Sequence, residues 1–250
     1  MLRVLLVILF VCWFSFPVFS KQPQTNYMFN IQKLSYFELD YNGALVKDEM
    51  RSRDGEIYYK VNDKIYEFSK EFSNVDTAVV VMDAWVDSGT DFLNQQFMPI
   101  FYETTFPLIQ AFSEKEFKIY AFTNMDTDAA YGEDLFPELE AMVSGGLVKK
   151  KYHKLGDAEE FQNELRQSGV KNIIYLGFAS NMCVIGRRVG MFGMLQMGFK
   201  TYFVPESSAA VETQQGWKTR EFHKYTISLI QHNFSGTISN QTILEAFLGH

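Results

Sequence analysis

The stretch that decides the fold is Asn172-Ile-Ile-Tyr-Leu-Gly-Phe-Ala-Ser-Asn-Met-Cys-Val184. It opens with the apolar run 172–176, continues through a short turn at Gly177, and leads into a helix-like stretch that begins at Cys183. A short, mostly apolar run is typical of a strand buried on both faces of a parallel sheet. We therefore predict a strand, a tight turn and a helix start.

The same unit recurs along most of the chain. Three further apolar runs, 78–82, 117–122 and 201–204, alternate with helix-like stretches. Those stretches are 92–112, 135–142, 158–167, 183–197 and 217–230. Alternating strands and helices favour an α/β fold with a doubly wound, mostly parallel sheet.

The N-terminal part has a different pattern. Short, tyrosine-rich, β-prone segments at 36–39, 56–61 and 64–68 are separated by turn signals such as Asn62-Asp63. Residues 28–72 therefore indicate β structure, and we assign 21–74 to a β-rich appendage and 75–250 to the main α/β domain.

The first twenty residues resemble a signal peptide. One basic residue, Arg3, precedes the apolar run 4–14, and Ser20 provides a small residue for cleavage. An uncleaved anchor is the alternative, although the run is short for a bilayer. Two glycosylation sequons, at Asn233 and Asn240, agree with passage through a secretory pathway. We expect a secreted or lumenal protein with no membrane association after cleavage.

Size and charge exclude some functions. Removal of the leader leaves 230 of 250 residues, which suits one α/β domain. The net charge of the chain is −7, and no basic stretch is interleaved with aromatic residues. We therefore expect no nucleic-acid partner.

Cys183 is the only cysteine outside the leader, so it has no partner for an intrachain disulfide. A helix start favours a thiolate, which predicts a nucleophile with a lowered pKa. The alternative is a small buried residue that fills space. Asp83 ends the run 78–82 and would lie at the same sheet edge, although an aspartate there can also be a turn or cap residue.

A cation is expected beside these two groups. The segment 147–155 carries four lysines, most of which belong on the surface. One lysine near Asp83 and Cys183 would stabilise a thiolate.

Together these motifs resemble the isochorismatase-like cysteine hydrolase superfamily. The resemblance rests on Val79-Val-Val-Met-Asp83, on Asp83-Ala-Trp-Val-Asp87, and on the segment 177–187 with its Asn-Met-Cys-Val sequence. It implies a three-layer α/β/α sandwich with a flavodoxin-like sheet, and an Asp-Lys-Cys triad made of Asp83, Cys183 and either Lys154 or Lys150.

The resemblance also implies how the reaction would proceed. Asp83 would take the proton of Cys183, and Cys183 would attack a carbonyl to form a thioester that water cleaves. A cis peptide before Ala179 would let the backbone N–H groups of Ala179 and Cys183 bind an oxyanion. Trp85, Phe178 and Asn181 would line the substrate pocket, with Trp85 favouring flat or apolar ligands.

No metal or other cofactor is expected. Zinc-dependent members of the superfamily carry histidines in the loop after the second strand, whereas 123–128 contains none, and the four histidines of the chain lack metal-ligand spacing. Asp126 and Asp128 are interpreted as turn residues.

Two functions follow from this pattern. The first is a secreted cysteine hydrolase acting on a small amide, ester or related molecule. The second is an inactive secreted protein that binds a small molecule in the same pocket. Analogy with the superfamily adds a homo-oligomer as an expectation.

Overall fold

The structure is a computed structural model that describes residues 23–42, 44–47, 60–124 and 134–249. The predicted leader lies outside the described residues, and so do Asp126 and Asp128. In the described ranges, no helix is both long enough and apolar enough to cross a membrane.

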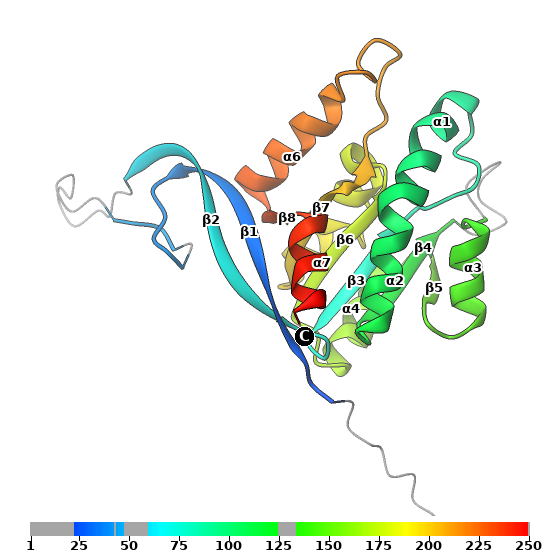
Figure 1. Cartoon of the computed structure of the whole chain (residues 1–250), viewed down its shortest axis with the longest axis horizontal. Coiled ribbons are helices and arrows are strands. Elements are labelled where there is room, and N and C mark those ends of the chain that lie inside the picture. Colours follow the sequence, from blue (N-terminus) through cyan, green and yellow to red (C-terminus); the bar gives the residue numbers. More distant parts are fainter. Residues whose placement is uncertain (1–22, 43, 48–59, 125–133, 250) are drawn as a thin grey trace, which may run out of the picture.

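A single sheet of eight strands forms the centre of the molecule (Figure 1). Its order is β2-β1-β8-β7-β6-β3-β4-β5, and the six strands from β8 to β5 are parallel. This confirms the predicted mostly parallel α/β fold. The strands are β1 (Asn26–Phe37), β2 (Val61–Ser73), β3 (Thr77–Met82), β4 (Lys118–Thr123), β5 (Lys149–Tyr152), β6 (Asn172–Phe178), β7 (Lys200–Ala209) and β8 (Gly236–Ile238).

Helices cover both faces of the sheet and complete three layers. The first face is covered by α1 (Asp91–Ile100), the π-helical turn η2 (Phe101–Thr105), α2 (Phe106–Glu114), α3 (Pro137–Ser144) and α7 (Asn240–Leu248). The second face is covered by α4 (Asp157–Gln167), α5 (Met191–Gln196) and α6 (Glu221–Asn233). Successive residues of β3 alternate between these two cores, because side chains on a strand point to opposite faces.

The N-terminal β structure is part of the same sheet. β1 pairs antiparallel with β8 on one side and with β2 on the other. Phe29, Ile31 and Phe72 are fully buried in the core, while the far ends of the two strands project from the body as an arm (Figure 1). The sequence predicts shorter strands here, because only one face of the arm is apolar and the runs are interrupted by polar residues.

Three elements escaped the sequence prediction: β5, β8 and α7. β5 is the edge strand of the sheet and has the sequence Lys-Lys-Lys-Tyr. Lysines protect an edge strand from pairing with other chains, but they also remove the apolar run that marks a strand. β8 has only three residues.

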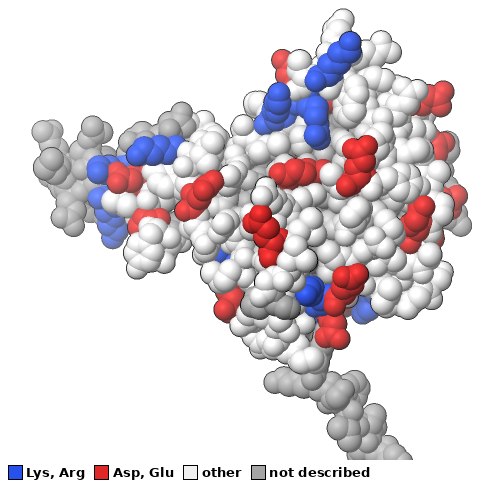
Figure 2. Space-filling model, viewed as in Figure 1, with Lys and Arg blue, Asp and Glu red and all other residues white. Residues whose placement is uncertain are grey.

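The carboxyl ends of the parallel strands lie at the top of the molecule in Figure 1. In the same view, Lys and Arg side chains gather at this end, around the loop before α6, and along the arm, whereas acidic side chains are spread over the body (Figure 2). Because ligands bind beyond the carboxyl ends of strands in such sheets, the search for a site begins at this end.

Candidate active site

The site forms where the chain reverses its direction across the sheet. From β3 the chain builds β4 and β5 on one side, and then β6, β7 and β8 on the other. Asp83 directly follows β3, and Cys183 lies in the π-helical turn η3 (Ser180–Val184) after the neighbouring strand β6. The sequence placed these two residues at one edge, and the structure brings them together at the switch point.

Gly177 permits this close approach of the two strands. Its φ is +92°, and a Cβ atom there would lie 2.1 Å from the carbonyl oxygen of Met82. Any other residue would therefore push β6 away from the end of β3, and with it the turn that carries Cys183.

Asp83 is buried and held in an unusual backbone conformation. Its φ is +46°, and its N–H donates to the carbonyl of Phe122 at 3.1 Å. Oδ1 lies 2.7 Å from Nε2 of His153. Oδ2 lies 3.6 Å from Nη2 of Arg187, and within the described residues it makes no hydrogen bond of regular geometry. One carboxylate oxygen is thus fixed by His153, while the other lies toward Arg187.

His153 and Arg187 are basic side chains beside Asp83; His153 is the nearer, at 2.7 Å, and Arg187 lies at 3.6 Å. His153 follows β5, and its backbone N–H donates to the carbonyl of Thr123 at 2.9 Å, which extends the pairing of β5 with β4. The imidazole stacks on Phe122, with ring centroids 5.5 Å apart. Its second nitrogen, Nδ1, lies 3.7 Å from Oδ2 of Asp157. Buried carboxylates therefore face both nitrogens of the ring.

The two lysines expected near Asp83 are placed elsewhere. Lys150 forms an ion pair with Glu140. Lys154 reaches Glu160 at 2.8 Å on the surface, where 46% of its side chain is exposed. Both lysines line a cavity together with Asp157, whereas the side chain that pairs with Oδ1 of Asp83 is His153.

The environment of Cys183 differs from the expectation of a lowered pKa. The pKa of Cys183 is raised to about 12, first by burial and then by the negative charge and hydrogen bonding of Asp83. Arg187 acts in the opposite direction. This corrects the sequence prediction, because desolvation and the carboxylate outweigh the helix start. The raised pKa favours the thiol form of Cys183 over the thiolate.

The turn before Cys183 has the expected backbone form. The peptide bond Phe178–Ala179 is cis. Ser180, fully buried, donates a hydrogen bond to Nδ1 of His223 at 2.9 Å, because Nε2 of His223 already donates to the carbonyl of Pro205 at 3.1 Å. The nucleophile turn is therefore attached to α6 through a buried histidine.

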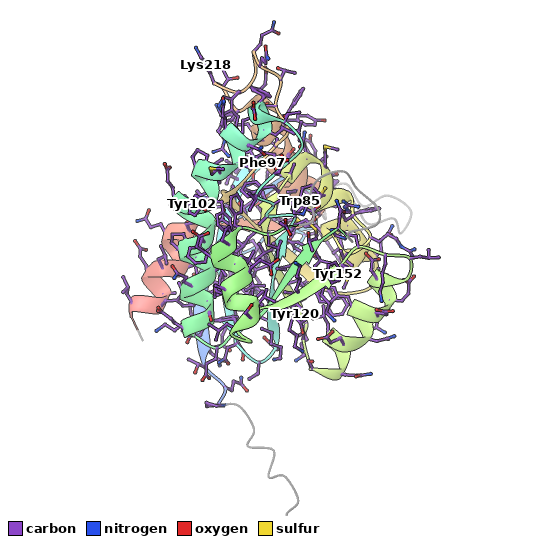
Figure 3. All side chains as sticks on the ribbon, turned by 90° about the vertical axis from the view of Figure 1, so that its right-hand side faces the viewer. Trp85, Phe97, Tyr102, Tyr120, Tyr152 and Lys218 are labelled. Carbon is purple, nitrogen blue, oxygen red and sulfur yellow. The ribbon has the colours of Figure 1, made fainter. Side chains whose placement is uncertain are left out.

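The three residues expected to line a pocket differ in their surroundings. Phe178 is buried and stacks on Phe97 at 4.7 Å. Trp85 donates from Nε1 to the hydroxyl of Thr123 at 3.0 Å and lies with Phe97 toward the upper end of the molecule in Figure 3. Asn181 pairs through its side-chain amide with both backbone groups of Val211, at 2.9 and 3.3 Å. Asn181 therefore anchors the loop after β7.

No role in the site was predicted from the sequence for His153, Asp157 or Arg187. Arg187 donates to Asn124 at 3.1 Å and also reaches Asp83, whereas its neighbour Arg188 pairs with Glu159 on the surface. A signal for Arg187 existed: it lies four residues after Cys183, so one helical turn returns it to the same side.

A cavity of about 250 Å³ adjoins the site behind His153. It is lined by Phe122, Asp157 and Phe161, with residues of β5 and the following turn; Tyr152 marks this edge in Figure 3. In the described residues, no group of three or more His, Cys, Asp or Glu side chains is arranged to hold a metal ion.

The described fold resembles several solved structures. The YcaC gene product of Escherichia coli, described as an octameric hydrolase of unknown specificity, aligns with a TM-score of 0.52 and 15% identity over 71% of this chain and 81% of its own. YcaC of Pseudomonas aeruginosa gives 0.51 and 18% over 68% and 79%, and an isochorismatase of Pseudomonas putida gives 0.51 and 15% over 67% and 90%. No curated protein matches the sequence.

The family model of the isochorismatase domain matches residues 77–242, which is the region from β3 into α7. The match includes Asp83, His153 and Cys183. Since this match covers well over half of the chain, the protein belongs to the family of isochorismatase-like cysteine hydrolases.

Proposed function

We propose that the protein is a hydrolase in which Cys183 attacks a small amide, ester or related substrate, with Asp83 as its proton acceptor and His153 in the position of the family lysine. The observation that carries this proposal is the state of Asp83. Its Oδ1 is fixed by His153, and the same carboxylate interacts with the thiol of Cys183, whose pKa it raises.

The first half of the reaction forms a thioester. Asp83 takes the proton from Sγ while the sulfur electron pair forms a bond to the substrate carbonyl carbon, whose oxygen becomes an oxyanion. The backbone N–H groups of Ala179 and Cys183 are its proposed donors. When the carbonyl re-forms, the bond to the leaving group breaks, and Asp83 returns the proton to that group.

The second half restores the enzyme. Water gives one proton to Asp83 while its oxygen attacks the thioester carbon. The acid product then leaves as the carbon–sulfur bond breaks, and Sγ takes the proton back from Asp83. Arg187 and His153 compensate the negative charge that moves between Asp83 and Cys183.

Trapping of the thioester tests this proposal. Mature protein is mixed with a panel of small p-nitrophenyl esters and aryl amides, quenched in acid, and analysed by mass spectrometry of intact protein and peptides. We expect an acyl group on Cys183 and turnover that is lost in Cys183→Ala. Arg188→Gln, which removes a surface charge five residues away, is the matched control and should keep its activity.

One observation favours the alternative, an inactive binding protein. The raised pKa of Cys183 leaves little thiolate at neutral pH. Binding of panel compounds to wild type and Cys183→Ala with equal affinity, without an acyl adduct in wild type, would favour this second function and contradict the first.

We further propose secretion, glycosylation and self-association. Asn233 is exposed at the end of α6, whereas Oδ1 of Asn240 accepts a hydrogen bond from Ser207 at 3.0 Å. Expression of the full chain in cultured animal cells should give a secreted form that begins after Ser20, with a glycan at Asn233 that Asn233→Gln removes. Light scattering on the purified protein measures its oligomeric state; a monomer or unprocessed leader would contradict these parts.

A further inference from the structure

The two carboxylates at His153 determine which form of the ring fits the site. Oδ1 of Asp83 lies 2.7 Å from Nε2, and Oδ2 of Asp157 lies 3.7 Å from Nδ1. A neutral imidazole has one N–H donor and one acceptor nitrogen, whereas an imidazolium has two donors. Because both neighbours are carboxylates, only the imidazolium presents a proton to each of them.

We infer that His153 acts as a buried cation in the proposed hydrolase. Asp157 is the positioning residue that stabilises the positive charge of the ring. This inference rests on the proposed function for its kinetic consequence, but the charge of His153 can be measured without a substrate. It assigns Asp157 a role that is separate from proton transfer at Cys183.

Asp157 is built to face the ring. It is the first residue of α4 and lies four positions after His153, so one turn of chain brings the two side chains together. Its Oδ1 accepts a hydrogen bond from the N–H of Ala158 at 2.7 Å, which fixes the carboxylate and leaves Oδ2 toward Nδ1. Nδ1 has no hydrogen-bond partner among the described residues, so the Asp157 charge is its nearest compensation.

The charges around the ring balance only when it is protonated. Asp83 and Asp157 supply two negative charges, and Arg187, 3.6 Å from Asp83, supplies one positive charge. From β4 the apolar ring of Phe122 covers His153, and Cys183 faces Asp83 as a thiol. The three lysines that line the cavity beside Asp157 are each paired with a glutamate: Lys150 with Glu140, Lys151 with Glu164 and Lys154 with Glu160. A neutral His153 would leave a buried excess of negative charge, which is costly.

This charge has a consequence for the reaction. When Asp83 takes the thiol proton, negative charge moves from the carboxylate to Sγ, and a cation on Oδ1 of Asp83 remains in the site to balance it. A nearby carboxylate favours the charged form of an imidazole, so Asp157 supports the positive charge that His153 supplies beside Asp83.

The first test is the ring charge. The ¹⁵N shifts of protein labelled at histidine should show both nitrogens of His153 protonated at pH 7.5, and only one protonated in Asp157→Asn. Loss of one opposite charge at this distance lowers the ratio of imidazolium to neutral ring by a factor of about ten or more. The signal is assigned as the one that moves in Asp157→Asn. Glu160→Gln, also in the first turn of α4, is the matched control and should leave it unchanged.

The second test separates a charge effect from a structural effect. Asp157→Asn should lower kcat/KM about tenfold or more at pH 8 and move the loss of activity with rising pH to a lower pH. In a His153→Lys background, the lysine is charged without help, so the same substitution should change kcat/KM less than about threefold.

The outcomes are distinct. A neutral His153 ring in wild type, or an equal loss in both backgrounds, would overturn the role of Asp157. A charged ring that depends on Asp157 in a protein without turnover would refute the hydrolase proposal and leave the charge assignment standing. If His153→Lys fails to fold, the ¹⁵N measurement still decides the charge assignment.

Discussion

Two buried histidines lie near Cys183, one in contact with Asp83 and the other with Ser180, and their surroundings differ in charge. His153 lies between two carboxylates, Asp83 and Asp157. His223 lies between the Ser180 hydroxyl and the Pro205 carbonyl. Both side chains are at least nine-tenths buried. Burial alone therefore does not define the role of a histidine; the charge of its neighbours does.

His223 is held neutral. Burial, and then the positive charge of Arg220, lower its pKa to about 4. Its Nε2–H donates to Pro205, its Nδ1 accepts from Ser180, and its backbone N–H donates to Glu212 at 2.8 Å. A neutral ring satisfies every partner here, so His223 supports the turn that carries Ser180 and Cys183, whereas the partners of His153 are two carboxylates.

Removal of the carboxylate that His153 shares with Cys183 should have the largest effect. In Asp83→Asn, turnover should fall by a factor of about 10² to 10⁴, the usual range for loss of an acid–base group. The thiol pKa should fall below the wild-type value of about 12, because one of the groups that raise it is gone, but burial should keep it above the ordinary value. Turnover and thiol ionisation should thus move in opposite directions.

Iodoacetamide alkylation of Cys183 between pH 7 and pH 10 measures this ionisation. Asp83→Asn should be alkylated faster than wild type at pH 9, and Glu160→Gln should behave as wild type. Faster alkylation of wild type would contradict the assignment of Asp83 as a group that raises the thiol pKa.

The neutral histidine should make the fold sensitive to acid. Because the pKa of His223 is lowered to about 4 in the folded state, against 6.5 in the unfolded chain, the unfolded chain takes up a proton first as the pH falls. Its contribution is present above pH 6.5 and is lost as the pH falls towards 4. Between pH 7.5 and pH 5 we expect about 2 kcal/mol of stability to be lost through this residue.

Urea denaturation at both pH values measures the difference. His223→Gln should lower stability at pH 7.5 but reduce the further loss at pH 5 by about 2 kcal/mol. Circular dichroism at pH 7.5 checks that the variant is folded. An equal loss in wild type and variant would mean that His223 is not the residue that couples acid to unfolding.

The sequence predicts the fold and half of the site for the same reason. Asp83 and Cys183 follow β3 and β6, which are fully buried and therefore appear as apolar runs. In a doubly wound sheet, the ends of such strands meet at a known edge. The positions of Asp83 and Cys183 in the chain were therefore sufficient to predict that the two residues lie close together.

The rest of the site depends on features that the pattern of apolar residues does not show. β5 is a lysine-rich edge strand, so its end, and hence the position of His153, was not recognised. The charge of each histidine depends on partners far along the chain: Asp83 is 70 residues from His153, and Ser180 is 43 from His223. Likewise, the thiol pKa depends on burial, which a short motif does not contain.

The smallest of these effects should come from Ser180→Ala. This change removes the hydroxyl that donates to Nδ1 of His223 and leaves a buried acceptor without a partner, which costs about 1–3 kcal/mol. Ser228→Ala is the matched control, because Ser228 donates to Lys224 on the exposed side of α6. Thermal unfolding should show a clear decrease in Tm for the first variant and little change for the second. Equal decreases would mean that His223 does not support the nucleophile turn through Ser180. The decrease in Tm for Ser180→Ala should not change with salt concentration, because the hydrogen bond between Ser180 and His223 joins two neutral groups. This separates it from the contacts of His153, whose partners are carboxylates.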